Sequence, residues 1–158
     1  MLTDCEGSES GLAHTHSGKP SERYDSYRKM YVNCTHVRKN LEIVFINHQK
    51  PYNFEFLTNI REVTGYVLIV GNTFDRFRLP NLRVIRGRTL YFEQNTEATW
   101  NGTDGEIEIN TRDSAETKSK RGYSLYVAIN YEVNSTTIGL KEISLPSLHG
   151  NTEFLYRN

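Results

Sequence analysis

The sequence has no long apolar run, no excess of one charge and only two cysteines. No segment approaches the roughly 20 apolar residues that cross a bilayer. The polar start lacks the apolar region of a signal peptide, so we expect a processed chain or a fragment. Basic and acidic residues number 19 each, which argues against a nucleic-acid partner or an anionic-membrane surface. A single domain spanning 1–158 is predicted, since this length supports one core.

Motifs of catalysis are also missing. There is no phosphate-cradling glycine loop and no kinase signature. Residues 7–11 resemble a serine-hydrolase elbow only loosely, because Glu9 occupies the position of the nucleophile. His14 and His16 would share one face of an extended segment, but no third ligand follows at a telling spacing. Sugar-cleaving β-helix enzymes need clustered acidic residues, whereas Glu42 is isolated among apolar ones. We therefore expect no metal, no cofactor and no enzymatic activity.

The two cysteines leave the cellular compartment open. Cys5 and Cys34 could form a disulfide that closes a loop of about 30 residues and contributes roughly 3–4 kcal/mol. They could equally be unrelated buried thiols of a cytosolic protein. Glycosylation sequons at Asn33, Asn101 and Asn134 favour secretion.

A repeated pattern is the strongest indication of the fold. Each copy places apolar residues three apart, follows them with a glycine and then enters an apolar run: Leu57, Ile60, Val63 and Gly65 before residues 66–70, and Leu79, Leu82, Ile85 and Gly87 before residues 90–92. The second copy begins 22 residues after the first, a period typical of solenoids. The apolar residues are predicted to point inside the coil, and each glycine to form a tight turn. An ordinary antiparallel β-protein is the alternative.

Further elements fit the same scheme. A shortened third copy has Leu145, Leu148 and Gly150 before residues 154–156. Two more strands are predicted from alternation, with these residues on one face of each: Leu41, Ile43 and Phe45 in the first, and Tyr123, Leu125, Val127 and Ile129 in the second.

Residues 21–31 are predicted to form an amphipathic helix that covers the open end of the solenoid. Ser21 is its expected N-cap. Its core-facing residues are expected to be Tyr24, Tyr27, Met30 and Tyr31.

The strand pattern stops at about 93–122. This stretch is polar, with Trp100 as its only large aromatic residue, and it ends in a basic run at residues 118–121. We interpret it as an irregular insertion that loops out between two rungs. The basic run could be cut by a processing protease, could be a solvated loop, or could come from an unremoved intron.

Five segments resemble the receptor L domain that epidermal growth factor receptors and insulin receptors share: residues 33–43, 56–69, 79–87, 123–127 and 139–143. The second segment is more similar to the growth factor receptor branch. The resemblance that they carry covers about 125 of the 158 residues, everything except the insertion. The resemblance is closest to the first of the two L domains and to invertebrate members. The last turn, near residue 150, is shorter than in the family, as expected for a fragment or an unusual splice form.

This resemblance implies a fold and a function. The fold would be a mainly β, right-handed β-helix of leucine-rich-repeat character, with an N-terminal capping helix and a Cys5–Cys34 disulfide. The chain would lie on the extracellular side of the plasma membrane, or be secreted, and hold an EGF-like protein ligand together with a second L domain. Binding would release the dimerisation arm of a cysteine-rich region, and the receptor dimer would activate a tyrosine kinase that is absent here. A secreted, kinase-less decoy and a structural or adhesion solenoid are the alternatives.

The resemblance also implies ligand contacts, which map onto Leu12, His14, Phe45, Gly71, Phe92 or Glu93, and Ala128 or Ile129. Gly71 and Ala128 are smaller than the family's apolar residues. Losing two buried apolar side chains would cost a few kcal/mol, or about a hundredfold in affinity. The alternatives are therefore a ligand of a different shape, or no ligand.

Overall fold

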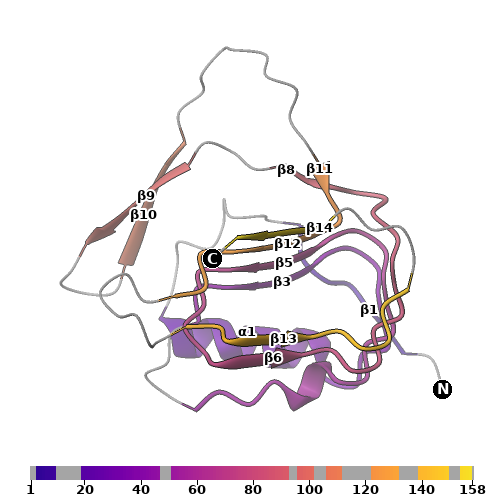
Figure 1. The fold of residues 1–158 in the computed structure, drawn as a ribbon. Helices are drawn as coiled ribbons and strands as arrows, with labels where there is room; N and C mark the ends of the chain where they lie inside the picture. The colour runs from indigo at the N-terminus through magenta and orange to yellow at the C-terminus, as the bar shows by residue number, and fades with distance from the viewer. Residues whose placement is uncertain are drawn as a thin grey trace.

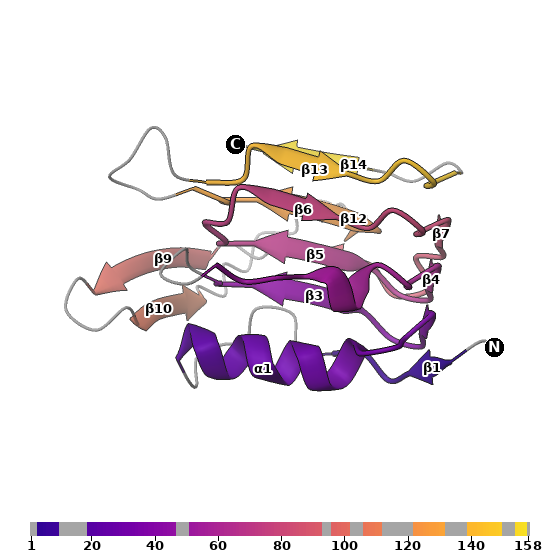
Figure 2. The ribbon, with the colours of Figure 1, turned by 90° about the horizontal axis from the view of Figure 1, so that it is seen from below.

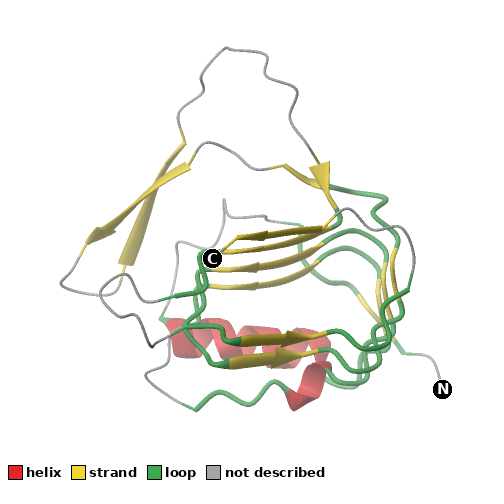
Figure 3. Cartoon of the chain, viewed as in Figure 1, coloured by secondary structure: helices red, strands yellow, loops and turns green. Residues whose placement is uncertain are grey.

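The fold is mainly β, with short strands stacked in parallel sheets and a single α-helix among the described residues (Figure 1, Figure 3). The structure, a computed structural model, describes residues 3–9, 19–46, 51–92, 96–101, 106–111, 122–131, 139–149 and 154–157.

Three parallel sheets recur in the same order along the chain. The β2 sheet contains β1 (Asp4–Cys5), β2 (His36–Val37), β4 (Glu62–Val63) and β7 (Val84–Ile85). The β5 sheet contains β3 (Leu41–Val44), β5 (Val67–Val70), β12 (Leu125–Ala128) and β14 (Phe154–Arg157). The β6 sheet contains β6 (Arg76–Arg78) and β13 (Glu142–Ser144). Figure 2 shows the strands of each sheet stacked one above another.

The interior lies between these sheets and is apolar. It contains the residues that the spacing of three predicted to point inward, all buried: Leu57, Ile60, Val63, Leu79, Leu82 and Ile85. The β5 sheet adds inward side chains from alternate positions, such as Leu41, Ile43, Val67 and Ile69. Each fully buried side chain of this kind contributes about 1.5–3 kcal/mol. The repeat pattern is therefore confirmed as a core pattern.

Each of the first three strands of the β5 sheet ends at a residue with positive φ. These residues are Phe45 (φ 52°), Gly71 (φ 69°) and Ile129 (φ 54°). A left-handed residue interrupts the alternation of a strand, so the next residue points inward in its place. Ile46, directly after Phe45, is fully buried in the interior as a result.

Because of this corner, two residues lie on a different face of their strands from the one predicted. Alternation placed Phe45 with Leu41 and Ile43, but its ring packs outside the β5 sheet, next to the cluster that contains Val44. Ile129 was predicted to share a face with Leu125 and Val127, which are buried, but it is 51% exposed.

Tyr123 was also predicted to share a face with Leu125, but Leu125 lies in the interior and Tyr123 packs against the outer cluster. Its own strand, β11 (Gly122–Tyr123), ends before the bend at Ser124, so the alternation of β12 does not extend back to it.

Two buried asparagines satisfy the backbone at the positive-φ corner. The side chain of Asn72 accepts a hydrogen bond from the Ile46 N–H (3.0 Å) and donates to the Ile43 carbonyl (2.9 Å). One turn further on, the Asn130 side chain donates to the Ile69 carbonyl (2.8 Å). Its Oδ1 accepts from the backbone and side-chain nitrogens of Asn72, at 3.0 and 2.9 Å. The pair links three successive turns of the chain.

The glycine turns predicted from the repeats are only half correct. Gly87 does have a positive φ of 61°. Gly65 does not, and its role is to leave space, because a Cβ there would lie 1.9 Å from Asn40 Oδ1. That oxygen accepts the Tyr66 N–H at 3.1 Å, so a side chain at this position would displace a buried hydrogen bond.

Helix α1 (Pro20–Tyr31) begins one residue before the predicted start. Its N-cap is Lys19 rather than Ser21. Proline suits the first helical position because its missing N–H would have no helical partner there. Glu22 fixes this start, since its carboxylate accepts the Lys19 N–H at 3.1 Å.

The helix covers the end of the stack beside β3 (Figure 2). Tyr27 and Tyr31 are buried in the interior, and Tyr24 packs against it, as predicted. Met30 is 36% exposed, and its predicted core position is wrong. At 100° per residue, Met30 points roughly 90° away from the direction that the three tyrosines share.

The insertion leaves the stack through a short antiparallel stem. Strand β8 (Tyr91–Phe92) pairs with β11, while β12 pairs directly with β5, so the β5 sheet is continuous. Within the insertion, β9 (Thr96–Asn101) pairs with β10 (Glu106–Thr111). The expectation of an irregular loop is wrong for β9 and β10, whose polar sequences did not predict strands.

The outer surface of the β2 sheet carries polar contacts and an ion pair between neighbouring strands. His36 Nδ1 lies 3.2 Å from Asp4 Oδ1 and its Nε2 lies 3.6 Å from Glu62 Oε1. Arg86 donates from Nε to the same Glu62 oxygen. This hydrogen bond from Arg86 lowers the pKa of Glu62 below its ordinary value of 4.5.

We predict that Asn72→Ala lowers the free energy of unfolding by about 2–4 kcal/mol, because it leaves buried backbone groups at Ile43 and Ile46 without partners. The measurement is urea unfolding followed by circular dichroism. Asn81→Ala is the matched control, since that side chain bonds only the exposed Thr58 carbonyl among the described contacts. The control should lose less than about 1 kcal/mol. Equal losses would contradict the role given to Asn72.

A second prediction concerns pH. Because the folded-state pKa of Glu62 is lowered, its contribution to stability is present above pH 4.5 and disappears as the pH falls through the folded value. Glu62→Gln should cost less than about 1 kcal/mol at neutral pH, and less at about pH 3 than at neutral pH. Urea unfolding at both pH values tests this, with the exposed Glu55→Gln as control. A cost that is unchanged at the lower pH would contradict the ion-pair explanation.

Candidate ligand-binding face

The outer face of the β5 sheet is covered by apolar and aromatic side chains rather than by charge. Its buried cluster contains Val44, Tyr66, Leu68, Val70, Tyr91, Tyr126 and Ala128. Tyrosines from different parts of the chain contact one another here. The ring centroids of Tyr66 and Tyr91 are 5.7 Å apart, and those of Tyr91 and Tyr126 are 4.8 Å apart. Tyr91 belongs to β8, so this contact fastens the stem of the insertion to the β5 sheet.

Glu42 lies on this face, is 2% exposed and accepts a hydrogen bond from the Tyr66 hydroxyl at 2.5 Å. A buried carboxylate needs such partners, because desolvation without them is costly. The sequence showed Glu42 as isolated, and the structure shows that its partner comes from the next turn. The Glu42 side chain therefore has a structural role in this arrangement, which is consistent with a binding surface.

Phe45 and Gly71 form one unit. A Cβ on Gly71 would lie 2.3 Å from Phe45 Cδ1, so the absence of a side chain gives the ring its place. The Phe45 backbone is fixed from two sides: its N–H donates to the Val70 carbonyl at 2.9 Å, and its carbonyl accepts from Arg23 Nη1 at 2.6 Å. The Phe45 ring, at the end of the preceding strand, fills the space that a larger side chain at position 71 would occupy.

Arg23 reaches this corner from α1. It is partly buried, and burial is the main cause that lowers its pKa. The neighbouring Tyr27 hydroxyl contacts the Val44 carbonyl at 3.4 Å, and burial raises the pKa of Tyr27 to about 12. The capping helix therefore positions the end of β3 through two side chains that donate to backbone oxygens.

The alternative contacts at residues 128 and 129 differ in accessibility. Ala128 is in register with Val70 and is 2% exposed, so it belongs to the buried outer cluster. Ile129 follows at the positive-φ corner with half of its surface exposed. A β-branched residue with positive φ is unusual and directs its side chain to solvent here.

Phe92 lies on a different element, the stem of the insertion, and is 45% exposed. A Cβ on Gly122 would meet the side chains of Leu90 and Phe92 within 3.0 Å. The structure thus places Phe45, Gly71 and Ile129 at equivalent corners after β3, β5 and β12, whereas Phe92 follows Tyr91, which packs toward the other ends of β5 and β12. Leu12, His14 and Glu93 lie outside the described residues.

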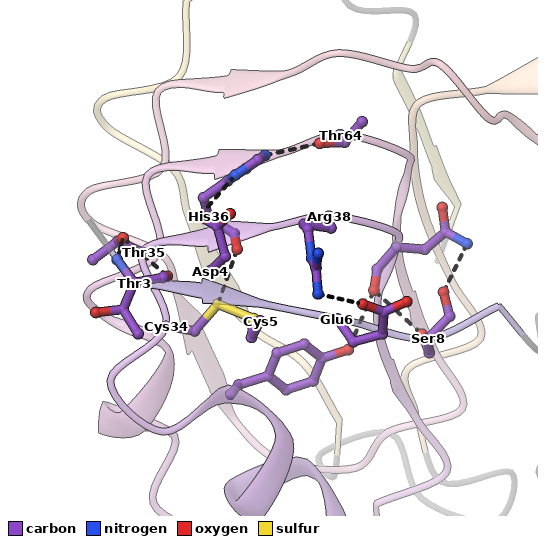
Figure 4. Close-up of a disulfide and its surroundings, with 12 residues drawn as sticks. Thr3, Asp4, Cys5, Glu6, Ser8, Cys34, Thr35, His36, Arg38 and Thr64 are labelled. Atoms are coloured by element: carbon purple, nitrogen blue, oxygen red, sulfur yellow. Dashed lines mark hydrogen bonds and ion pairs between the residues drawn. A yellow bond between two sulfur atoms is a disulfide. The ribbon is translucent and has the colours of Figure 1, made fainter.

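The disulfide that the family resemblance implied is present between Cys5 and Cys34, with Cα atoms 5.6 Å apart (Figure 4). It ties β1 to the turn after α1. Asn33 is exposed beside it, while the Thr35 hydroxyl is bonded to the Thr3 backbone. The side chain of Asn101 and all of Asn134 lie outside the described part of the chain.

Two features are absent from the described residues. No group of three or more histidine, cysteine, aspartate or glutamate side chains there could hold a metal ion. No helix in that part is long and apolar enough to cross a membrane. His14 and His16, the metal pair considered from sequence, lie outside it.

Comparison with known proteins identifies relatives of the stacked segments. The family model described as the receptor L domain matches residues 33–99. Over 144 residues, or 91% of the chain, the sequence is 32% identical to the epidermal growth factor receptor of Gallus gallus, covering 16% of that protein. It is 45% identical over 87 residues to the receptor tyrosine-protein kinase erbB-4 of Mus musculus, covering 55% of this chain and 6% of that one. The epidermal growth factor receptor of Drosophila melanogaster is 39% identical over 90 residues, again covering 55% and 6%. The chain spans no more than 16% of the length of these relatives.

We predict that Gly71→Ala lowers the free energy of unfolding by about 1–3 kcal/mol, through its positive φ and the collision with the Phe45 ring. In a Phe45→Ala background the same change should cost only about 1 kcal/mol, the backbone part. Gly87→Ala is the matched control, because it has a similar φ and its Cβ would meet no atom closer than 3.3 Å. A double-mutant cycle by chemical unfolding measures the difference. A cost of Gly71→Ala that does not depend on Phe45 would contradict the pairing.

Proposed function

This chain is a receptor L domain of the epidermal growth factor receptor family, and from that premise we propose that it binds an EGF-like protein on the outer face of its β5 sheet. A receptor L domain is a binding module, so the chain is not itself an enzyme. Its relatives are receptor tyrosine kinases, which supports an extracellular location. In this proposal it is the first L domain of a single-pass receptor.

The observation that carries the binding site is the alignment of corners at the ends of β3, β5 and β12. Phe45, Gly71 and Ile129 occupy equivalent positions there, and two of the three are large and apolar. A protein ligand typically buries apolar side chains of this kind, exposed next to a preformed cluster, at the centre of its interface. Phe92 remains a proposed contact on the stem, toward the other end of the β5 sheet.

The two small residues of the predicted site have different consequences in this proposal. The Phe45 ring already covers Gly71, so the ligand meets an aromatic surface shifted by one strand. Ala128 lies buried, and Ile129 is the residue that supplies the contact. We therefore propose a rearranged rather than a lost binding surface. Leu12, His14 and Glu93 remain proposed contacts at its edge.

The partners of the whole receptor are part of the same proposal. A second L domain would hold the ligand from the other side, and a cysteine-rich region would carry the dimerisation contacts. The receptor dimer would then activate the kinase. The names of the relatives support a tyrosine kinase in the parent protein. A secreted decoy without a kinase would use the same face and differ only in what accompanies this domain.

We further propose that residues 1–158 form one right-handed β-helical solenoid, with α1 as its cap and about 93–122 as an insertion. The order in which the chain visits the three parallel sheets supports this architecture. Asn33 is the sequon whose exposure supports glycosylation. The other two residues of this sequon are held in the fold, Cys34 by the disulfide and Thr35 by its hydrogen bond to Thr3. The glycan would therefore be added before folding is complete.

The test is binding of purified chain to a panel of immobilised EGF-like domains by surface plasmon resonance. We expect saturable binding that Ile129→Ala weakens about tenfold, the effect of roughly 1.4 kcal/mol of lost apolar burial. Phe45→Ala should weaken it by a similar or larger factor. Val32→Ala is the matched control, because Val32 is 50% exposed and follows the capping helix, away from the proposed site.

Thermal unfolding of each variant separates lost affinity from lost structure. Ile129 is half exposed, so its replacement should leave the melting temperature nearly unchanged. Saturable binding that is weakened equally by Val32→Ala and Ile129→Ala would place the site elsewhere. No binding to any EGF-like domain would favour the structural or adhesion alternative.

A further inference from the structure

Four arginines gather on the outer surface of two neighbouring strands of the β2 sheet: Arg61, Arg83, Arg86 and Arg88. All four side chains are exposed. Arg61 and Arg83 precede β4 and β7 at the same position, and the Arg83 N–H donates to the Arg61 carbonyl at 2.8 Å. Parallel strands lie about 4.8 Å apart, so their guanidinium groups project from adjacent rows. Arg88 lies one residue after the Gly87 turn, where its N–H donates to the Thr64 carbonyl at 3.1 Å.

Little negative charge offsets this cluster, which we call the arginine row. Glu62 is the acidic residue within it, and Arg86 already occupies that carboxylate. Within the described part of the chain, no carboxylate lies within ion-pair distance of Arg61, Arg83 or Arg88. Among the described residues, these three guanidinium groups therefore have no acidic partner. The chain as a whole has no net charge, so this excess is local.

Several other basic residues on the described strands are compensated, whereas Arg28 and Lys29 on helix α1 have no acidic partner among the described residues but lie away from the β2 sheet. At the β1 end of the same sheet, Arg38 and Lys39 pair with Glu6 at 2.8 and 2.7 Å, part of which Figure 4 shows. On the β6 sheet, Arg76 and Arg78 share Glu142 at 3.6 and 3.2 Å. The contrast makes the arginine row a distinct surface.

We propose that the arginine row binds a sulfated polysaccharide of the glycosaminoglycan class. Guanidinium groups bind tetrahedral oxyanions through two parallel hydrogen bonds, which suits sulfate groups. A row of such groups at strand spacing suits a polymer that carries sulfates along its length. The choice of a sulfated glycan over other polyanions rests on the extracellular location in the proposed function. The β2 and β5 sheets lie on different sides of the stack (Figure 1), so the glycan and a protein ligand would bind at separate surfaces.

The experiment measures binding of the purified chain to immobilised heparin by biolayer interferometry at several NaCl concentrations. We expect binding at about 0.15 M NaCl. The double variant Arg61→Ala/Arg83→Ala should weaken it at least tenfold and lower the slope of log Kd against log salt by about two. Arg76→Ala/Arg78→Ala removes the same charge from the β6 sheet and should change Kd less than twofold.

Three outcomes would overturn the proposal: no binding at about 0.15 M NaCl, equal losses in the two double variants, or equal binding to fully desulfated heparin. Equal or tighter binding to anionic phospholipid vesicles would also overturn it, in favour of a membrane surface. Binding of an EGF-like domain is measured on the same samples. Because the arginine row lies apart from Phe45 and Ile129, that binding should be unchanged in both double variants, and each function can fail without the other.

Discussion

The rest of the structure depends on the corner that follows β3, β5 and β12, the first three strands of the β5 sheet. There the chain takes a positive φ at Phe45, Gly71 and Ile129 and exposes backbone groups inside an apolar interior. Asn72 and Asn130 bond those groups and one another, so the turns are held at one spacing. Because unsatisfied buried polar groups are costly, this hydrogen-bonded column fixes the register of the three sheets.

That constraint also creates both proposed surfaces. By shifting the alternation at each corner, it turns Phe45 and Ile129 outward, beside the buried tyrosine cluster of the β5 sheet. By holding successive turns in register, it stacks Arg61 against Arg83 on the β2 sheet. Residues some twenty positions apart in sequence thus become neighbours, and a repeat in sequence becomes a row on a surface. Helix α1 supports the same corner from below through Arg23 and Tyr27.

Much of the fold could be predicted from the sequence, and the failures have local causes. The spacing of three identified the inward residues from Leu57 to Ile85, and the tyrosine stripe identified the covering helix. Phe45 and Ile129 were assigned to the wrong face because a positive φ in a non-glycine residue has no reliable sequence signal. The role of Asn72 was missed for the same reason, although an asparagine two residues after a strand, repeated at Asn130, is a signal that could have been used.

The sequence by itself determined the kind of protein. Its apolar periodicity specifies stacked strands around one core, and its ordered motifs place it among the receptor L domains, because both properties belong to contiguous segments. Only the tertiary structure decided which side chains meet: Tyr66 with Glu42, Phe45 with Gly71, and Arg86 with Glu62. Each of these pairs joins neighbouring turns, and their contacts depend on register and on the corner geometry. Those are properties of packing, which no single segment of the chain contains.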